Sequence, residues 1–138
     1  MTERVLHARF RWAGGEHRFA LPMAYHPGMS GFQRHGIEDP QARLKRLLLN
    51  ENTVNDVFDV VRGGLIGGKA MPLGRDLDEF MLKHVVRRPL AEGTVLAKAI
   101  LLVAIFGIPE GLADTVLHPA DIVAEATDDT VTALDKAA

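Results

Sequence analysis

The chain contains no cysteine among its 138 residues. This absence excludes disulfide bonds, catalysis by a thiol, and zinc or iron–sulfur sites built on cysteine. It also suits a protein that works in a reducing compartment. With 47% hydrophobic and 25% charged residues, the composition is that of an ordinary globular domain with one core.

Long apolar segments and a strong excess of one charge are also lacking. The longest uncharged apolar run, Ala99 to Ile108, has ten residues, whereas a helix that spans a bilayer needs about 20. The first eleven residues carry four charges where a secretion signal would need an apolar core. The net charge is −2, and aromatic residues are not interleaved with the basic groups. We therefore predict neither membrane binding nor nucleic-acid binding.

Residues arranged for catalysis are scarce. The single serine, Ser30, lacks the G-x-S-x-G spacing of a nucleophile elbow. None of the six histidines has the H-x-x-x-H or H-E-x-x-H spacing of a helical metal site. His7 and His17 are expected either at exposed positions on the outer face of a hairpin or as a cross-strand pair that binds a metal or senses pH. We therefore predict no enzyme activity, no catalytic residue, no metal site and no cofactor.

One glycine-rich stretch is similar to a phosphate-binding loop. Residues 62–72 read RGGLIGGKAMP, which contains the G-x-x-x-x-G-K spacing of a P-loop. Ala70 stands where a P-loop needs serine or threonine for magnesium, and the residues before the motif have the pattern of a helix and not of a strand. We therefore interpret Gly63-Gly64 as the C-terminal end of a helix and Leu65-Ile66 as an apolar anchor.

Residues 4–21 have the alternation of a β-hairpin. Phe10 and Trp12 alternate with charged residues, a turn follows at residues 13–16, and Phe19 returns on the apolar face. An isolated hairpin is marginally stable in water, so this one must pack its apolar face on helices or on a neighbouring subunit. Phe10, Trp12 and Phe19 are therefore a candidate self-association face.

From residue 40 onward the apolar residues repeat with a helical period. Before that point, residues 22–39 contain several prolines and glycines and are predicted to be a long loop or a mobile segment. We predict four helices: one that begins at Pro40, one from a capping box at Thr53 and Asp56 to Gly63-Gly64, one that Asp76 caps and Arg87-Arg88-Pro89 ends, and an apolar central helix from Leu90 to Phe106.

The predicted fold class is α+β, mostly α, with the N-terminal β-hairpin packed on a bundle of about four helices. It forms a single domain at residues 1–108. Residues 109–138 hold seven acidic residues against one lysine, a net charge of −6, and are expected to form an acidic C-terminal tail. This tail is solvated, or it docks on a basic partner or back onto the domain. Val116-Leu117 and Ile122-Val123 are candidates for a docked piece, and the last ten residues are predicted to be disordered.

Two segments resemble a family of known proteins. Residues 53–68 read TVNDVFDVVRGGLIGG, and residues 88–107 read RPLAEGTVLAKAILLVAIFG. In this order, after an N-terminal strand pair, they resemble the small tail proteins of gene transfer agents and related long-tailed phages. That family is usually read as tail assembly chaperones and is sometimes labelled tail tube proteins. The resemblance covers residues 4–108, and its motif residues are Gly64, Leu65, Ile66, Gly67, Gly68, Arg88, Pro89 and Leu90.

The chain departs from this family in two segments. The family's first helix after the hairpin is regular and rich in leucine and glutamate, whereas Pro27 and Gly28 interrupt the corresponding part of this sequence. The segment after residue 109 has no counterpart in the resemblance. Both departures concern segments that could contact a partner.

The resemblance implies a non-enzymatic role in tail assembly. Tail assembly chaperones are thought to coat the long, helical, aggregation-prone tape-measure protein until tail tube subunits polymerise around it. The implied partners are the tape-measure protein and/or tail tube subunits, the implied assembly is a homo-oligomer, and the implied location is the cytoplasm of the bacterial host cell. The alternative is a structural component of the virion tail, a tail tube or completion protein. Tube subunits are generally β-rich, which the helical period after residue 40 disfavours.

Overall fold

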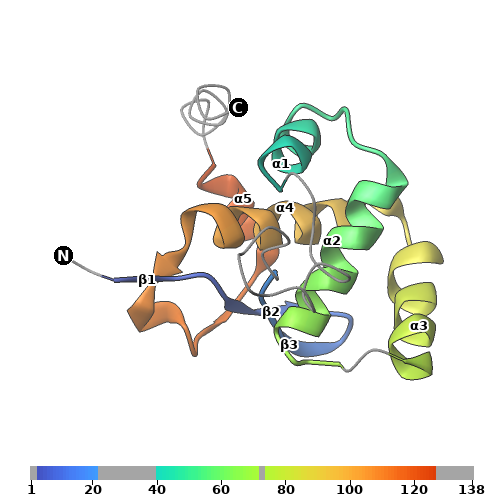
Figure 1. Cartoon of the computed structure of the whole chain (residues 1–138), viewed down its shortest axis with the longest axis horizontal. Coiled ribbons are helices and arrows are strands. Elements are labelled where there is room, and N and C mark those ends of the chain that lie inside the picture. Colours follow the sequence, from blue (N-terminus) through green and yellow to red (C-terminus); the bar gives the residue numbers. More distant parts are fainter. Residues whose placement is uncertain (1–2, 22–39, 72–73, 127–138) are drawn as a thin grey trace, which may run out of the picture.

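An N-terminal β-hairpin lies against a group of helices in the computed structural model, which describes residues 3–21, 40–71 and 74–126 (Figure 1). The predicted α+β class with a majority of helix is confirmed. The expected long loop at residues 22–39 and the expected disordered end lie outside the described residues. The described elements are β1 (Arg4–Val5), β2 (Ala8–Trp12), β3 (Gly15–Phe19), α1 (Pro40–Leu48), α2 (Val54–Gly67), α3 (Arg75–Met81), the π-helix η2 (Leu82–Val86), α4 (Leu90–Phe106), β4 (Ile108–Pro109), the 3-10 helix η3 (Glu110–Leu112), β5 (Val116–Leu117) and α5 (Pro119–Ala124).

Strands β2 and β3 form the predicted hairpin in antiparallel register, with Phe10 opposite His17. Ala13 and Gly14 form a two-residue turn, with φ angles of +56° and +76°. A two-residue turn in which both residues have positive φ matches the right-handed twist of the strands. The turn is shorter than the four residues expected from the sequence, because β3 already begins at Gly15.

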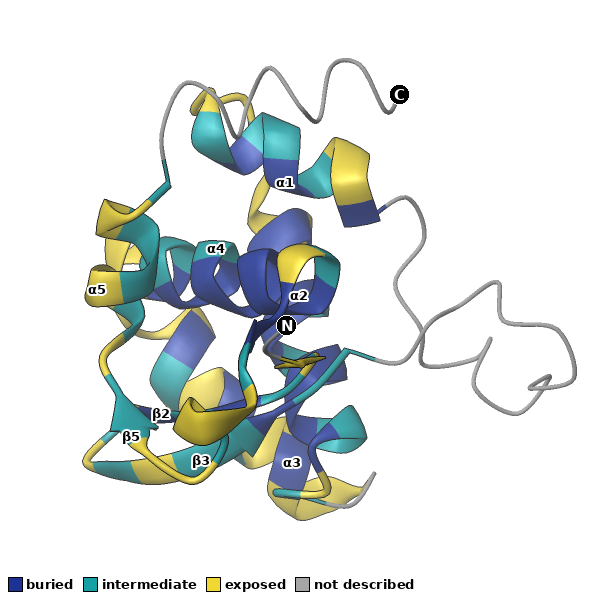
Figure 2. Ribbon diagram, turned by 90° about the vertical axis from the view of Figure 1, so that its left-hand side faces the viewer, coloured by how far each residue is buried: buried dark blue, intermediate teal, exposed yellow. Residues whose placement is uncertain are grey.

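Helix α4 is the central element, and α1, α2 and α5 pack on it (Figures 1 and 2). Nine of its residues are buried, which confirms the predicted core helix. Its ends match the prediction as well, because it begins directly after Pro89 and stops at Gly107, whose φ of +74° favours glycine. Among the described residues, no single helix has the length and apolarity needed to cross a membrane. The required length and apolarity are met only by two helical segments taken together, Arg75–Val86 and Leu90–Phe106, and the chain bends by 116° between them.

The hairpin packs its apolar face on the helices, which is the first of the two alternatives considered above. Phe10 and Phe19 are buried in the chain's own core, with their ring centroids 5.9 Å apart. These two residues are therefore unavailable to a second subunit, and their prediction as a self-association face is wrong. Trp12 is partly buried and reaches the surface.

Two helix ends differ from the sequence prediction. Helix α2 continues through Gly63-Gly64 and ends at Gly67, so the glycine pair does not end the helix. Each interior glycine costs a helix about 1 kcal/mol relative to alanine, so contacts with the rest of the fold must offset that cost. Helix α3 begins at Arg75, after Gly74, so Asp76 lies in the first turn and does not cap the helix.

The segment after residue 108 belongs to the same domain as far as the structure describes it. Strand β4 pairs with β1 near the N-terminus, and β5 extends the hairpin by parallel pairing with β2. Helix α5 packs on α4, with Ile122 and Val123 against the core. The docked piece predicted at Val116-Leu117 and Ile122-Val123 is confirmed. The predicted domain boundary after residue 108 is wrong for residues 109–126.

Candidate functional site

The first motif of the family resemblance places α2 against strand β3. The carbonyl oxygen of Gly64 accepts a hydrogen bond from the N–H of Ala20 at 3.1 Å. A Cβ atom at Gly64 would lie 3.0 Å from the ring of Phe19, and a Cβ atom at Gly68 would overlap the carbonyl oxygen of Arg18. The two glycines therefore allow a close backbone approach that a larger residue would prevent.

This packing explains the stretch that is similar to a P-loop. Leu65 is fully buried and Ile66 is partly buried, as predicted for an apolar anchor, although both lie inside α2. Gly67 is the last residue of that helix, and Lys69 is exposed in the turn that follows, with a φ of +60°. In a P-loop the glycines precede a helix, so that their N–H groups face the phosphate. Here the glycines lie in and directly after a helix, which is the opposite order.

The second motif lies at the surface. Arg88, Pro89 and Leu90 are all exposed in the turn between η2 and α4 and at the start of α4. The Nε and Nη2 groups of Arg88 donate hydrogen bonds to the carboxylate of Glu92, at 3.0 and 3.2 Å. None of the three motif residues belongs to the buried core, so core packing does not account for them.

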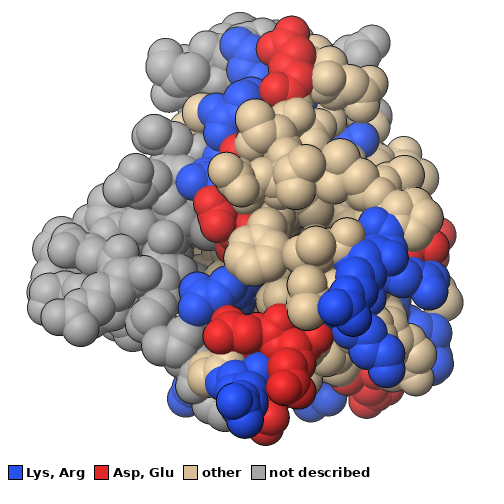
Figure 3. Space-filling view, turned by 90° about the vertical axis from the view of Figure 1, so that its right-hand side faces the viewer, with Lys and Arg blue, Asp and Glu red and all other residues tan. Residues whose placement is uncertain are grey.

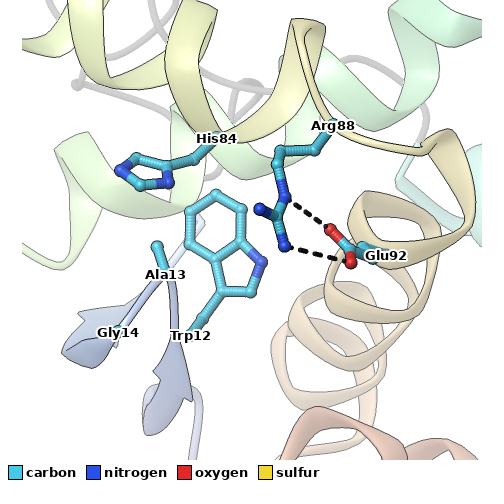
Figure 4. A pocket seen from close by; sticks show the side chains of 6 residues that line it. All are labelled: Trp12, Ala13, Gly14, His84, Arg88 and Glu92. Atoms are coloured by element: carbon cyan, nitrogen blue, oxygen red, sulfur yellow. Dashed lines mark hydrogen bonds and ion pairs between the residues drawn. The ribbon is translucent and has the colours of Figure 1, made fainter.

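Arg88 lies at the edge of a hollow beside the hairpin turn, which Figure 4 shows from close by. The hollow has a volume of about 340 Å³. The indole of Trp12, the imidazole of His84 and the ion pair of Arg88 with Glu92 border it, together with the turn residues Ala13 and Gly14. We call this feature the Trp12 hollow.

Four rings pack together where the hairpin meets α3 and η2. The ring centroid of Phe80 lies 5.6 Å from that of Trp12, 5.3 Å from that of His17 and 4.6 Å from that of His84. His17 therefore lies on the inner face of the hairpin, and its predicted outer position is wrong. The strand alternation that places Phe19 on the inner face also places His17 there, so the inner position of His17 could have been predicted from the sequence.

The predicted pair of His7 and His17 does not form. His7 precedes β2, and the residue opposite His17 is Phe10. Within residues 3–21, 40–71 and 74–126, no group of three or more histidine, aspartate or glutamate side chains is placed to hold a metal ion. The neighbour that could couple to the protonation of His17 is His84, which packs on the same Phe80 ring.

Burial lowers the pKa of both histidines below the ordinary value of 6.5. For His17, desolvation outweighs a backbone hydrogen bond and the negative charge of Glu16, both of which raise the pKa. For His84, desolvation acts in the same direction as the positive charges of Lys83 and Arg88 and the proximity of His17, so all four lower the pKa. The neutral imidazoles present at pH 7 suit the packed rings, whereas protonation adds like charges to one cluster.

We expect the ring cluster to make the protein less stable as the pH falls from about 7 to about 5. Since the folded-state pKa values of both histidines lie below the unfolded value of 6.5, the neutral rings stabilise the fold fully above that value, and the contribution is lost as the pH falls. The variant His17→Phe keeps a ring against Phe80 and removes one titrating group. When the pH is lowered from about 7 to about 5, the melting temperature of the wild type should therefore decrease by about 2 °C or more beyond the decrease of His17→Phe. Equal decreases in circular dichroism melts would rule out this role of His17.

Three exposed apolar residues lie within nine positions of the chain around the corner where η2 meets α4. Leu82, Val86 and Leu90 are 41%, 55% and 41% exposed. Single exposed apolar residues are common on proteins, but a group of them indicates a contact surface. Figure 3 shows a wide uncharged area, bordered by charged side chains, on the side of the molecule where α3 and η2 lie. We call Leu82, Val86 and Leu90 the corner patch.

Arg88 lies between Val86 and Leu90 in the chain, but the residues that line the Trp12 hollow include none of the three residues of the corner patch. Exposed apolar side chains such as those of the corner patch are suited to binding a protein through apolar contacts. Comparison of the chain with models of protein families, with curated proteins and with solved structures finds no match.

Proposed function

We propose that this protein is a phage-like tail assembly chaperone, which binds and solubilises the tape-measure protein during tail morphogenesis and catalyses no reaction. The observation that carries the proposal is the corner patch. Leu90 of this patch belongs to the R-P-L-A-E segment on which the family resemblance depends, yet it lies at the surface. An apolar motif residue that the core does not use is available for a partner.

The corner patch suits an amphipathic helix. Leu82 and Val86 are four residues apart along one helical segment, and Leu90 is the first residue of the helix that follows the turn. Helical partners bind such surfaces through apolar residues that recur along one face. The tape-measure protein implied by the family resemblance is long, helical and prone to aggregation. Covering its apolar stripe would remove that stripe from water and keep the protein soluble.

In this proposal several copies of the chain surround one tape-measure protein in the cytoplasm of the bacterial host cell. Since Phe10 and Phe19 are buried, contacts between copies would use other parts of the surface. Light scattering after size-exclusion chromatography tests the oligomer. A mass of several chains supports it, and a monomer at every concentration speaks against it.

The fold favours the chaperone over the alternative, a tail tube or completion protein of the particle. Tube subunits are generally β-rich and stack their sheets into a ring, whereas the strands described here have two to five residues and a helix forms the centre. Purified particles distinguish the two roles. A tube protein is abundant in mature tails, and a chaperone is absent from them.

Co-expression with the long helical protein encoded by the neighbouring gene tests the proposed function. We expect the helical protein to become soluble and to co-purify with this chain. The variant Leu90→Asp should lower the yield of soluble complex about tenfold, because burying an unpaired carboxylate in the interface costs at least about 1.4 kcal/mol. The measurement is the amount of helical protein in the soluble fraction.

Leu112→Asp is the matched control for this variant. Leu112 is 39% exposed, compared with 41% for Leu90, and it lies in η3, which follows the opposite end of α4. Thermal melts of both variants establish that they fold. If both substitutions lower the yield equally, the corner patch is not the binding surface. If the helical protein stays insoluble with the wild-type chain, the chaperone role is wrong.

A further inference from the structure

The indole of Trp12 forms one wall of the Trp12 hollow and is held in place by other rings. The ring centroids of Phe80, His84 and Phe19 lie 5.6, 5.9 and 6.5 Å from that of Trp12. Trp12 is only partly buried, and part of its surface borders the hollow (Figure 4). A fixed indole with surface open to a hollow is a place where the ring of a ligand can pack.

Arg88 borders the same hollow with part of its hydrogen-bonding capacity unused. It follows His84 by four residues, and Figure 4 shows both side chains beside the indole of Trp12. Its Nε and Nη2 groups donate to Glu92, which fixes the plane of the guanidinium. In the part of the chain that the structure describes, no group accepts a hydrogen bond from its Nη1. Nη1 is therefore available to donate to an oxygen of a ligand.

The charges around the hollow favour an anion over a cation. Arg88 and Glu92 form an ion pair, so their charges largely compensate each other. At the wall that His84 forms, the positive charges of Lys83 and Arg88 act together with the larger effect of desolvation to lower the pKa of the imidazole. The potential at this wall is therefore positive, which attracts a negatively charged group.

The hollow has room for one ring and a short acidic group. Its volume of about 340 Å³ is at the lower end of the range of about 300 to 1,000 Å³ for small-ligand sites. Its lining offers the ring surface of Trp12 and the guanidinium of Arg88. These two features match the two ends of a small aromatic acid, which has an apolar ring and a carboxylate.

We propose that the Trp12 hollow is a binding site for a small aromatic carboxylate. The ring of the ligand packs against the indole of Trp12, and its carboxylate accepts a hydrogen bond from Nη1 of Arg88. A hydrogen bond between two charged groups is stronger than one between neutral groups, so the carboxylate is preferred to a neutral amide. This site goes beyond the proposed function and does not depend on it, because its ligand is a small molecule and not the tape-measure protein.

Phenylacetate and three related compounds test the hollow in the full-length protein. Trp12 is the only tryptophan of the chain, so its fluorescence reports on the hollow directly. We expect phenylacetate to change this fluorescence with a dissociation constant on the order of 1 mM, as suits a ligand of this size. Phenylacetamide lacks the negative charge, cyclohexylacetate lacks the aromatic ring, and phenethylammonium carries the opposite charge. Each of the three should bind at least about fivefold more weakly than phenylacetate.

Arg88→Gln removes the guanidinium and leaves the carboxylate of Glu92 without this partner at the hollow. We expect it to weaken the binding of phenylacetate at least about tenfold and to change that of phenylacetamide less than about twofold. Arg87→Gln is the matched control, because it removes the same charge from an exposed residue that does not line the hollow. It should change the binding of phenylacetate less than about twofold.

Thermal melts of both variants establish that they fold. The inference is overturned if phenylacetate leaves the fluorescence of Trp12 unchanged, or if any of the three related compounds binds as tightly as phenylacetate. It is also overturned if Arg88→Gln binds phenylacetate like the wild type, or if Arg87→Gln weakens the binding as much as Arg88→Gln does.

Discussion

Replacing Gly68 with alanine is expected to destabilise the protein by about 3 kcal/mol or more. The added Cβ atom would overlap the carbonyl oxygen of Arg18 and lie 3.0 Å from the Cα atom of Phe19. Both are backbone atoms, so no change of rotamer relieves the overlap, and α2 must move away from β3. That movement also breaks the hydrogen bond from Ala20 to Gly64. Urea unfolding followed by circular dichroism measures the loss.

Alanine substitutions at two other glycines are the controls for the loss expected of Gly68→Ala. At Gly111 an added Cβ would meet no atom within 4 Å, so Gly111→Ala should change the free energy of unfolding by less than about 0.5 kcal/mol. At Gly64 the Cβ would lie 3.0 Å from a ring atom of Phe19, which is a side chain and can shift. We expect a loss of about 1 kcal/mol for Gly64→Ala. An unchanged urea midpoint for Gly68→Ala would contradict the close approach of α2 and β3.

Elements whose ends depend on local chemistry are predictable from the sequence. Helix α4 begins after Pro89 and ends at Gly107 in both the prediction and the structure. The capping box at the start of α2 forms as predicted, with Thr53 and Asp56 exchanging hydrogen bonds of 3.0 and 3.2 Å. In each case the residues that decide the boundary lie within a few positions of it.

Features that depend on distant contacts were missed for a physical reason. Gly63-Gly64 has a strong local tendency to end a helix, but the contact of Gly64 with the hairpin continues α2 beyond it. The apolar pair Val116-Leu117 indicated a docked piece, but no local feature showed that this piece forms strand β5 and pairs with β2 near the other end of the chain. The position of Arg88 beside Trp12 likewise depends on the 116° bend between two helical segments, which the motif letters do not contain.

Asp56 is a buried carboxylate, 4% exposed, that connects α1 to the start of α2. It accepts hydrogen bonds from Nε and Nη2 of Arg46 at 3.0 and 2.6 Å and from the N–H of Thr53 at 3.0 Å. The Nη1 group of Arg43 lies 3.7 Å away. Two basic residues of α1, Arg43 and Arg46, therefore pair with acidic residues of the next helix.

Asp56→Ala is expected to lower the free energy of unfolding by about 3 kcal/mol. The substitution removes half of the capping box and leaves Arg46 without this charge partner in a partly buried site. The side chain of Arg46 is 39% exposed, so water solvates part of its charge and the loss stays below that of a fully buried pair. Asp59→Ala is the control, because Asp59 pairs with Arg43 at 3.2 Å but is 47% exposed, and should cost less than about 1 kcal/mol. Similar losses for both variants in urea unfolding would contradict a special role of Asp56.

The same carboxylate makes stability depend on pH in the acid range. Hydrogen bonds from Arg46, then the bond from Thr53 and the charges of Arg46 and Arg43, lower the pKa of Asp56 from 3.8 to about 2, against burial, which raises it. Because the folded pKa lies below the unfolded one, this stabilisation is fully present above about pH 4 and is lost as the pH falls toward about 2. Asp56→Asn imitates the protonated carboxyl, so its deficit of about 2 kcal/mol at pH 7 should shrink to a fraction of that value at pH 2. A deficit that stays constant over this range would show that the shape of the Asp56 side chain, and not its charge, stabilises the connection between α1 and α2.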